Sequence, residues 1–82
     1  MAAQTRERDA DFGPNGIRVN AIAPGEIETS ILSPGTEDLI GDIPLRRLGQ
    51  PAEVASTIFF LCTDASSYVT GSEIHINGGQ PV

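Results

Sequence analysis

Lysine is absent from this sequence of 82 residues, and all five of its basic residues are arginines. Eleven Asp and Glu residues oppose them, so the formal net charge is −6. Proteins that bind nucleic acid hold its phosphates with clustered positive charge, so this balance disfavours nucleic acid as a partner. The acidic residues are scattered along the chain, which is typical of a solvated surface and not of an acidic interaction tail.

Tryptophan is also absent, and the chain has only one Tyr and three Phe. A chain of this length buries roughly 60% of the surface that it exposes when unfolded. Large aromatic side chains supply much of the buried area in small domains, and few are available here. We therefore expect one small domain, or a piece of a larger one, that gains stability from a partner surface.

Cysteine and histidine occur once each. This pair cannot build a zinc site of the usual spacing, and a single Cys cannot close an internal disulfide, so we expect no metal site and a reducing, cytoplasmic setting. No apolar run approaches the roughly 18 residues of a membrane span. The N-terminus has neither a basic start nor an apolar signal segment, so we expect neither export nor membrane insertion.

The order of predicted elements indicates an α/β fold. A helix over residues 1–12 is followed by a strand over 17–23, where apolar and polar residues alternate until Pro24 and Gly25 end it. A second strand is predicted over 72–77, where isoleucines alternate with Glu and His. With a helix between them, the two strands form a parallel βαβ unit.

The helix between the strands has the strongest local pattern and is predicted over residues 50–63. Pro51 suits the first helical position, and Glu53 lies in the first turn, where the helix dipole favours an anion. Apolar residues then recur at spacings of three and four, which predicts a broad buried face. Cys62 belongs to this face, so we expect its thiol to be buried.

Two segments of the chain resemble the C-terminal part of the short-chain dehydrogenases/reductases. They are GPNGIRVNAIAPGEIETSIL and PLRRLGQPAEVASTIFFLCTDASSYVTGSEIHINGG, and the similarity extends over nearly the whole sequence. The resemblance implies an NAD(P)-dependent oxidoreductase on a Rossmann-type sheet, in which the two predicted strands are the sixth and seventh. It rests on several linked pieces: Arg18-Val19-Asn20, Pro24-Gly25 with Thr29, Arg47-Leu48-Gly49 with Pro51 and Glu53, Thr70-Gly71, and Gly78-Gly79.

The resemblance implies that the loop after the first strand contacts the nicotinamide. Pro24 and Gly25 would shape the turn against the ring, and the backbone of Ile27 would bond the carboxamide. The Thr29 hydroxyl would reach either the carboxamide or the pyrophosphate. Ligands of open α/β sheets bind outside the carboxyl ends of the strands, which is where this loop lies. The cofactor of the family is NAD or NADP, and both remain open here.

Residues 26–44 contain Pro and Gly with few apolar residues, which predicts a mobile loop with one or two helical turns. The resemblance implies that this loop is the family's lid over cofactor and substrate. Ile31, Leu32, Leu39 and Ile40 would form its apolar underside. In this chain the same residues could instead be disordered, and both alternatives remain open.

The catalytic groups of the family are missing from the sequence. Hydride transfer in the family needs a Tyr as acid and base, a Lys four residues later that lowers the pKa of the Tyr, and a Ser that orients the carbonyl. The only Tyr, Tyr68, has Ser72 at that spacing, and no glycine-rich phosphate loop is present. We expect no catalytic residue here and no tight binding of NAD(P) by this chain alone. We hypothesise that Met1 is an internal methionine and the chain a fragment.

Two functions therefore remain open. The chain is either the C-terminal segment of an NAD(P)-dependent dehydrogenase or a stand-alone, non-catalytic interaction module. In both cases we expect a homo-oligomer through the last helix and the last strand, which the family uses for dimer contacts. We expect His75 at the surface or in an interface. Arg46 and Arg47 are expected to be solvated or paired with acids, with phosphate binding as the alternative.

Overall fold

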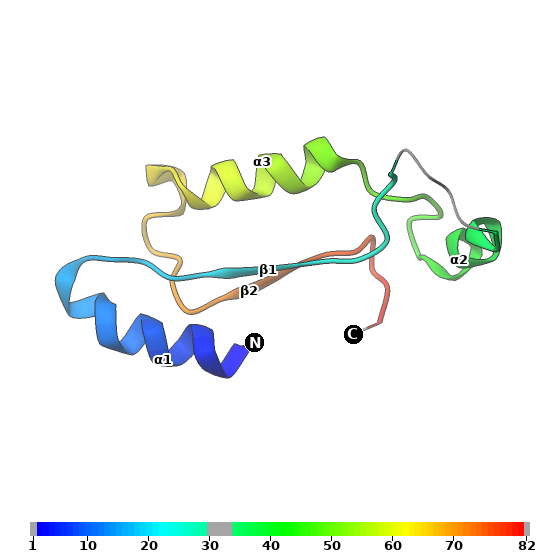
Figure 1. The fold of residues 1–82 in the computed structure, drawn as a ribbon. Helices are drawn as coiled ribbons and strands as arrows, with labels where there is room; N and C mark the ends of the chain where they lie inside the picture. The colour runs from blue at the N-terminus through cyan, green and yellow to red at the C-terminus, as the bar shows by residue number, and fades with distance from the viewer. Residues whose placement is uncertain (1, 30–33, 82) are drawn as a thin grey trace.

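The computed structural model describes residues 2–29 and 34–81 (Figure 1). Strands β1 and β2 pair in parallel, with Ala21 opposite Glu73, so the predicted α/β class with a parallel βαβ unit is confirmed. Helix α3 lies on one side of the strand pair and α1 on the other (Figure 1). The elements are α1 (Ala2–Phe12), β1 (Ala21–Pro24), α2 (Thr36–Asp42), α3 (Pro51–Leu61) and β2 (Glu73–Ile76), with 3₁₀ turns at Gly13–Asn15 and Asp64–Ser66.

Strand β1 begins later than the predicted start at Ile17, and side chains make part of the hydrogen bonding before it, although the Val19 carbonyl still accepts the Gly71 N–H at 2.8 Å. The Val19 N–H donates to Thr70 Oγ1 at 3.1 Å and not to a backbone carbonyl. The Asn20 side-chain oxygen accepts the Ser72 N–H at 3.0 Å. The regular ladder therefore starts one residue after Asn20.

The other elements lie where the sequence placed them, with shorter bounds. The predicted helix over 50–63 is α3, and the predicted strand over 72–77 is β2. The segment predicted as a loop over 26–44 contains the two-turn helix α2. Glu37 and Asp38 in the first turn of α2 are favourable there because they lie at the positive end of the helix dipole.

Arg18 joins the entrance of β1 to the end of α3. Its guanidinium donates to the carbonyls of Leu61 at 3.0 Å and Val69 at 3.2 Å, and to the Ser66 hydroxyl oxygen at 3.0 Å. The last carbonyls of a helix lack partners within the helix, and a cation there also complements the dipole. Ser66 is 1% exposed and donates to the Phe60 carbonyl, so Arg18 and Ser66 together close the end of α3.

The apolar face of α3 is open, which corrects the prediction of a broad buried face. Ile58, Phe59 and Phe60 are 44%, 72% and 42% exposed, and the Cys62 thiol, expected to be buried, is also exposed. A cavity of about 280 Å³ lies between this face and Ile22 of β1. Two strands are too narrow a sheet to cover a helix face of this width, because a stable sheet needs further strands.

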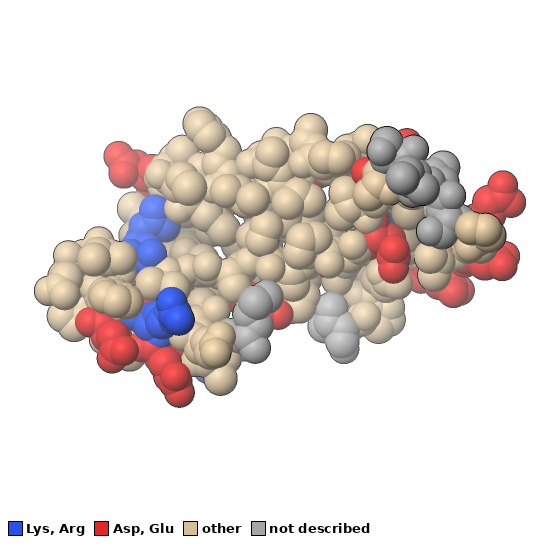
Figure 2. Space-filling model, in the orientation of Figure 1, with Lys and Arg blue, Asp and Glu red and all other residues tan. Residues whose placement is uncertain are grey.

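The molecule is elongated, with extents of 47 × 23 × 21 Å and a radius of gyration of 15.1 Å. A compact chain of this length would have a radius of gyration of about 12 Å. On the face that Figure 2 shows, the centre is largely uncharged, Arg lies toward the α1 end, and Asp and Glu gather toward both ends. Ile43, 2% exposed, is the one buried hydrophobic residue in the described ranges. None of the described helices is long and apolar enough to cross a membrane.

Candidate functional site

The carboxyl end of β1 is held tightly against the end of β2. The Gly25 N–H donates to the Ile76 carbonyl at 3.0 Å. A Cβ atom at Gly25 would lie 2.7 Å from Asn77 Cβ, closer than two carbon atoms can approach, so only glycine fits between the strand ends. Pro24 is the last residue of β1 and lies opposite Ile76, and the neighbouring Gly25 makes the last bond to β2, so the missing N–H of Pro24 costs no bond between the strands. The structure thus places Pro24 and Gly25 at the turn that the sequence identified.

The peptide groups on both sides of Ile27 are fixed by Gly49. The Gly49 N–H donates to the Glu26 carbonyl at 2.9 Å, and the Glu28 N–H donates to the Gly49 carbonyl at 2.8 Å. In a planar trans peptide the C=O and N–H point in opposite directions, and no described peptide bond is cis. The N–H and C=O of Ile27 itself therefore point away from Gly49, side by side, as one donor and one acceptor.

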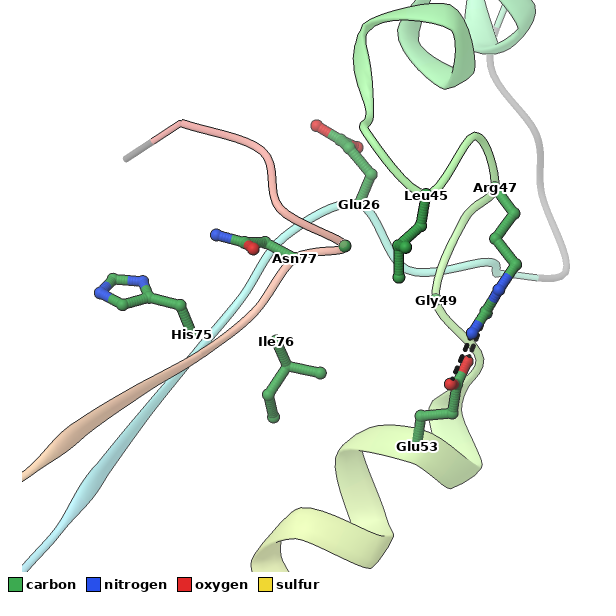
Figure 3. A pocket seen from close by; sticks show the side chains of 9 residues that line it. Glu26, Leu45, Arg47, Gly49, Glu53, His75, Ile76 and Asn77 are labelled. Carbon is green, nitrogen blue, oxygen red and sulfur yellow. Dashed lines mark hydrogen bonds and ion pairs between the residues drawn. The ribbon is translucent and has the colours of Figure 1, made fainter.

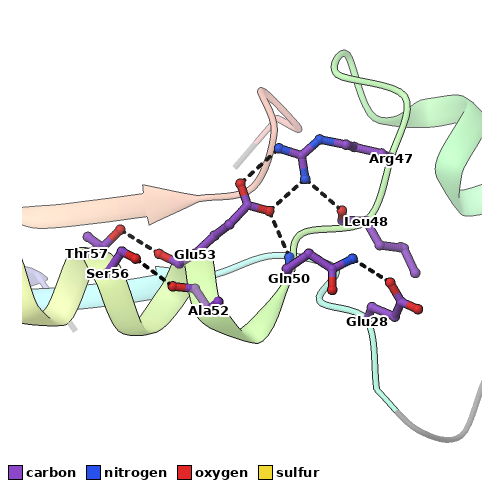
Figure 4. Close-up of polar contacts among 8 residues, drawn as sticks. All are labelled: Glu28, Arg47, Leu48, Gln50, Ala52, Glu53, Ser56 and Thr57. Atoms are coloured by element: carbon purple, nitrogen blue, oxygen red, sulfur yellow. Dashed lines mark hydrogen bonds and ion pairs between the residues drawn. The ribbon is translucent and has the colours of Figure 1, made fainter.

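A network of polar contacts connects this segment to the start of α3 (Figure 4). Gln50 Nε2 donates to Glu28 Oε2 at 2.5 Å. Arg47 donates to both carboxylate oxygens of Glu53, at 2.7 and 2.9 Å, and Glu53 also accepts the Gln50 N–H at 2.9 Å. Glu53 therefore accepts an N–H that has no partner within the helix, and it also neutralises the charge of Arg47.

These contacts shift the pKa values of both Arg47 and Glu53. Hydrogen bonds from Arg47, and then from the Gln50 N–H, lower the pKa of Glu53 to about 2. The same contact raises the pKa of Arg47. Both side chains are about half exposed, at 52% for Arg47 and 43% for Glu53, so solvent weakens the attraction between them. The prediction that this Arg pairs with an acid is confirmed for Arg47.

A cavity of about 180 Å³ opens between the end of β2 and the first turn of α3 (Figure 3). Figure 3 shows His75 and Ile76 on opposite sides of β2, with Ile76 toward the Arg47–Glu53 pair. His75 is exposed, as expected, and its Nε2 lies 3.5 Å from Glu73 Oε1. The cavity is lined by Glu26, Leu45, Arg47, Gly49, Glu53, His75, Ile76, Asn77 and Gly78.

The lid residues are divided between described and undescribed parts of the chain. Leu39 and Ile40 lie on α2, where Leu39 is 42% exposed and Ile40 is half-buried. Ile31 and Leu32 lie outside the described residues. Thr29 is exposed at the start of this loop, and it takes part in an interaction of its own.

A second cavity, of about 440 Å³, lies beside α2 and contains Ile40. Arg46 also lines it and is the one non-glycine residue of the described ranges with a positive φ, at 57°. Two acidic residues, Glu28 and Glu37, share the cavity with Arg46 and Arg47, so its charges balance. This balance gives no support to the alternative that the two arginines hold a phosphate.

The far end of the loop is anchored by the C-terminal glycines. The Leu45 N–H donates to the Gly78 carbonyl at 3.0 Å, and Ile43 is buried next to Gly78. Gly78 and Gly79 have φ values of +64° and +92°, which glycine adopts readily. The loop between Thr29 and Arg46 therefore has both ends fixed on the same side of the molecule.

Sequence reasoning missed two residues that shape the site. Gln50 was read only as the start of a helix, and Glu28 as one of many surface acids. No local pattern marks their contact, because they are 22 positions apart. No group of His, Cys, Asp or Glu that could hold a metal ion occurs in the described part of the chain, and Tyr68 is fully exposed.

Comparisons with known proteins find relatives that match nearly the whole of this chain. Protein FixR of Bradyrhizobium diazoefficiens is 63% identical over 81 residues, which are 98% of this chain and 29% of FixR. The 3-oxoacyl-[acyl-carrier-protein] reductase FabG of Aquifex aeolicus is 42% identical over 79 residues, which are 92% of this chain and 32% of FabG. This chain thus spans about a third of the length of these relatives.

A solved structure supports the fold assignment. The blue fluorescent protein from a metagenomic library, determined in complex with NADPH, superposes with a TM-score of 0.91 at 27% identity. The match covers 99% of this chain and 34% of that one. The sequence profile of the enoyl-(acyl carrier protein) reductase family matches residues 1–80. The Rossmann-type βαβ fold is confirmed, and the chain belongs to the short-chain dehydrogenases/reductases, in the family described as enoyl-(acyl carrier protein) reductase.

Proposed function

We propose that this chain supplies the nicotinamide side, the substrate lid and an oligomer contact of an NAD(P)-dependent short-chain dehydrogenase/reductase. When bound, the nicotinamide supplies or accepts the hydride. The observation that carries the proposal is the orientation of Ile27. Its N–H and C=O point the same way from the carboxyl end of β1, and a carboxamide offers the matching acceptor and donor.

The neighbouring residues support the same role. Pro24 and Gly25 bring the backbone to this position without a side chain between the strand ends. The Thr29 hydroxyl follows two residues after Ile27 and would bond the carboxamide or the pyrophosphate. On the other side of the loop, Leu39 and Ile40, with Ile31 and Leu32, would cover an apolar part of the substrate.

The chemistry itself would need groups from outside these 82 residues. A Tyr becomes an effective base near neutral pH when a Lys ammonium lowers its pKa, and this sequence has no Lys. The isolated chain should therefore not reduce ketones or oxidise alcohols. The free, exposed Cys62 fits a reducing, cytoplasmic setting for the assembled enzyme.

NMR of the isolated chain tests the cofactor contact. Titration with reduced nicotinamide mononucleotide, NADH and NADPH should shift the amide signals of Ile27 and Thr29, and the binding should be weak because no phosphate loop is present. AMP, which lacks nicotinamide, should leave these signals unchanged. Shifts confined to other residues, or none at saturating ligand, would rule out this contact.

The second candidate is a stand-alone interaction module, and the exposed surface favours it. The chain exposes 5897 Å². A compact monomer of its mass, 8.6 kDa, would expose about 4,700 Å², which leaves an excess of about 1,200 Å². An area of this size on each partner is typical of permanent interfaces. We propose that two or more copies associate through α3 and β2.

Light scattering at several concentrations tests the association. The wild-type chain should be a dimer or larger, and Phe59→Asp should shift it toward monomer because Phe59 is the most exposed large apolar residue of α3. Phe12→Asp is the matched control, since Phe12 is an exposed Phe on α1. A wild-type chain that stays a monomer, or equal effects of the two substitutions, would contradict the proposed surface.

A further inference from the structure

The contact between Glu28 and Gln50 is the shortest link between the Ile27 segment and α3. Gln50 Nε2 lies 2.5 Å from Glu28 Oε2, across 22 positions of sequence. A hydrogen bond from an amide to a carboxylate is stronger than one between neutral groups. Glu28 follows Ile27 directly, and the peptide group between them consists of the Ile27 C=O and the Glu28 N–H. The bond to Gln50 is therefore made by the side chain of a residue that belongs to this peptide group.

Gln50 also belongs to the capping box at the start of α3, together with Glu53. Gln50 is the residue before the first helical turn, a position that favours Ser, Thr, Asp or Asn over Gln. The backbone N–H of Gln50 is already accepted by Glu53, and Pro51 needs no partner for its nitrogen. The amide of Gln50 therefore joins the capped start of α3 to the segment after β1.

We propose that the Glu28–Gln50 hydrogen bond fixes the direction of the Ile27 peptide group, and that Glu28 and Gln50 are positioning residues for the nicotinamide contact. The relevance to cofactor binding rests on the proposed function. The backbone bond from the Glu28 N–H to the Gly49 carbonyl, 2.8 Å long, sets this peptide plane. The side-chain bond, which is exposed to solvent, joins the same two segments at Glu28 and Gln50 and so opposes rotation of this plane.

Other charged groups near Glu28 must be considered in any test. Arg46, Arg47 and Glu37 line the same cavity of about 440 Å³. Arg47 is held by Glu53, so its charge is largely neutralised. Arg46 attracts the Glu28 carboxylate and Glu37 repels it, so their effects on Glu28 oppose each other. The hydrogen bond to Gln50 is thus the directional contact of Glu28.

The test exchanges the two side chains. Gln50→Glu places a second carboxylate against Glu28, and the repulsion should lower the hydrogen-exchange protection of the Glu28 and Gly49 amides about tenfold at pH 7. The double variant with Glu28→Gln and Gln50→Glu restores an amide–carboxylate pair of reversed direction. It should recover protection to within about twofold of the wild type.

The pH profile separates positioning from a general structural effect. Below about pH 4 one carboxylate of the Gln50→Glu variant takes up a proton and donates to the other, so protection should return. A glutamate before α3 also favours the helix dipole, so the amides of α3 should be as protected as in the wild type. Gln4→Glu on α1 adds the same charge far from Glu28 and should change none of these rates.

Each outcome decides one question. Unchanged protection of Glu28 and Gly49 in Gln50→Glu, or failure of the double variant to restore it, would overturn the positioning role. If the exchange behaves as expected but reduced nicotinamide mononucleotide shifts no Ile27 signal in the wild type, the positioning of the peptide stands and the proposed cofactor contact is wrong. If Gln50→Glu weakens that shift and the double variant restores it, both are supported.

Discussion

Single residues at the strand ends are determined by how closely other segments approach them. A Cβ atom at Gly25 would lie 2.7 Å from Asn77 Cβ, and one at Gly78 would lie 2.8 Å from Ile43 Cγ2. Gly78 also has a φ of +64°, which an L side chain adopts at a cost. These glycines are therefore part of the packing that brings the loop ends together.

Gly78→Ala should destabilise the chain by about 2–4 kcal/mol, because a strained φ adds to the steric clash with Ile43. Urea denaturation followed by circular dichroism would measure the change. Gly13→Ala is the control, since an added Cβ there meets nothing within 4 Å. If both variants lose a similar amount of unfolding free energy, the contact with Ile43 does not account for the effect of Gly78→Ala.

The Arg47–Glu53 pair predicts a pH dependence with a defined sign. The folded pKa of Glu53 is about 2, below the ordinary value of 4.5, so the folded state favours the ionised form. This contribution is present above about pH 4.5 and is lost as the pH falls toward 2. Urea midpoints of the wild type and Glu53→Gln should therefore differ at pH 7 and converge near pH 2.

Salt provides the check on this prediction. Both side chains are about half exposed, so the difference at pH 7 should be small and should shrink further in 1 M NaCl. Glu7→Gln removes a carboxylate from the middle of α1, outside this pair, so its midpoint should keep the same small difference from the wild type at pH 7 and at pH 2. If the urea midpoints of Glu53→Gln and the wild type differ by the same amount at every pH, the contact between Arg47 and Glu53 is contradicted.

At the scale of elements, the end of α3 depends on a side chain from the entrance of β1. Arg18→Gln removes a guanidinium that donates to Leu61, Ser66 and Val69 and should destabilise the chain by about 1–3 kcal/mol. The amides of the last turn of α3 should exchange faster. Arg18→Lys should recover little, because an ammonium cannot span these acceptors.

Arg8→Gln on α1 is the control for charge, and it should leave α3 unchanged. If Arg18→Lys were as stable as the wild type, the positive charge alone would account for the effect. Loss of protection over all of α3, and not mainly at its end, would mean that Arg18 acts through the general fold.

The sequence predicted the elements better than their edges or their surroundings. Pro51, Glu53 and the apolar spacing identify α3, since local backbone preferences decide where a helix begins. The start of β1 was wrong because Thr70, 51 positions from Val19, takes a hydrogen bond that a local pattern cannot reveal. The contact between Glu28 and Gln50 was missed for the same reason, as it joins two segments across the loop.

At the scale of the whole molecule, the buried face predicted for α3 is open in this chain. The spacing of Ile58, Phe59 and Cys62 correctly marks an apolar surface, but burial also needs a layer to cover it. Two strands do not provide that layer. This chain spans about a third of the length of its relatives, and within its described residues the apolar face of α3 stays exposed.

The two fixed ends of the loop between Thr29 and Arg46 have a consequence for variation among related proteins. Because Ile27 meets Gly49 directly, the segment between them begins and ends at neighbouring points. Lengthening such a segment costs little entropy, about 0.6 kcal/mol for each doubling. Insertions there should leave the strand ends undisturbed, so the length of this segment can change without loss of the strand pairing.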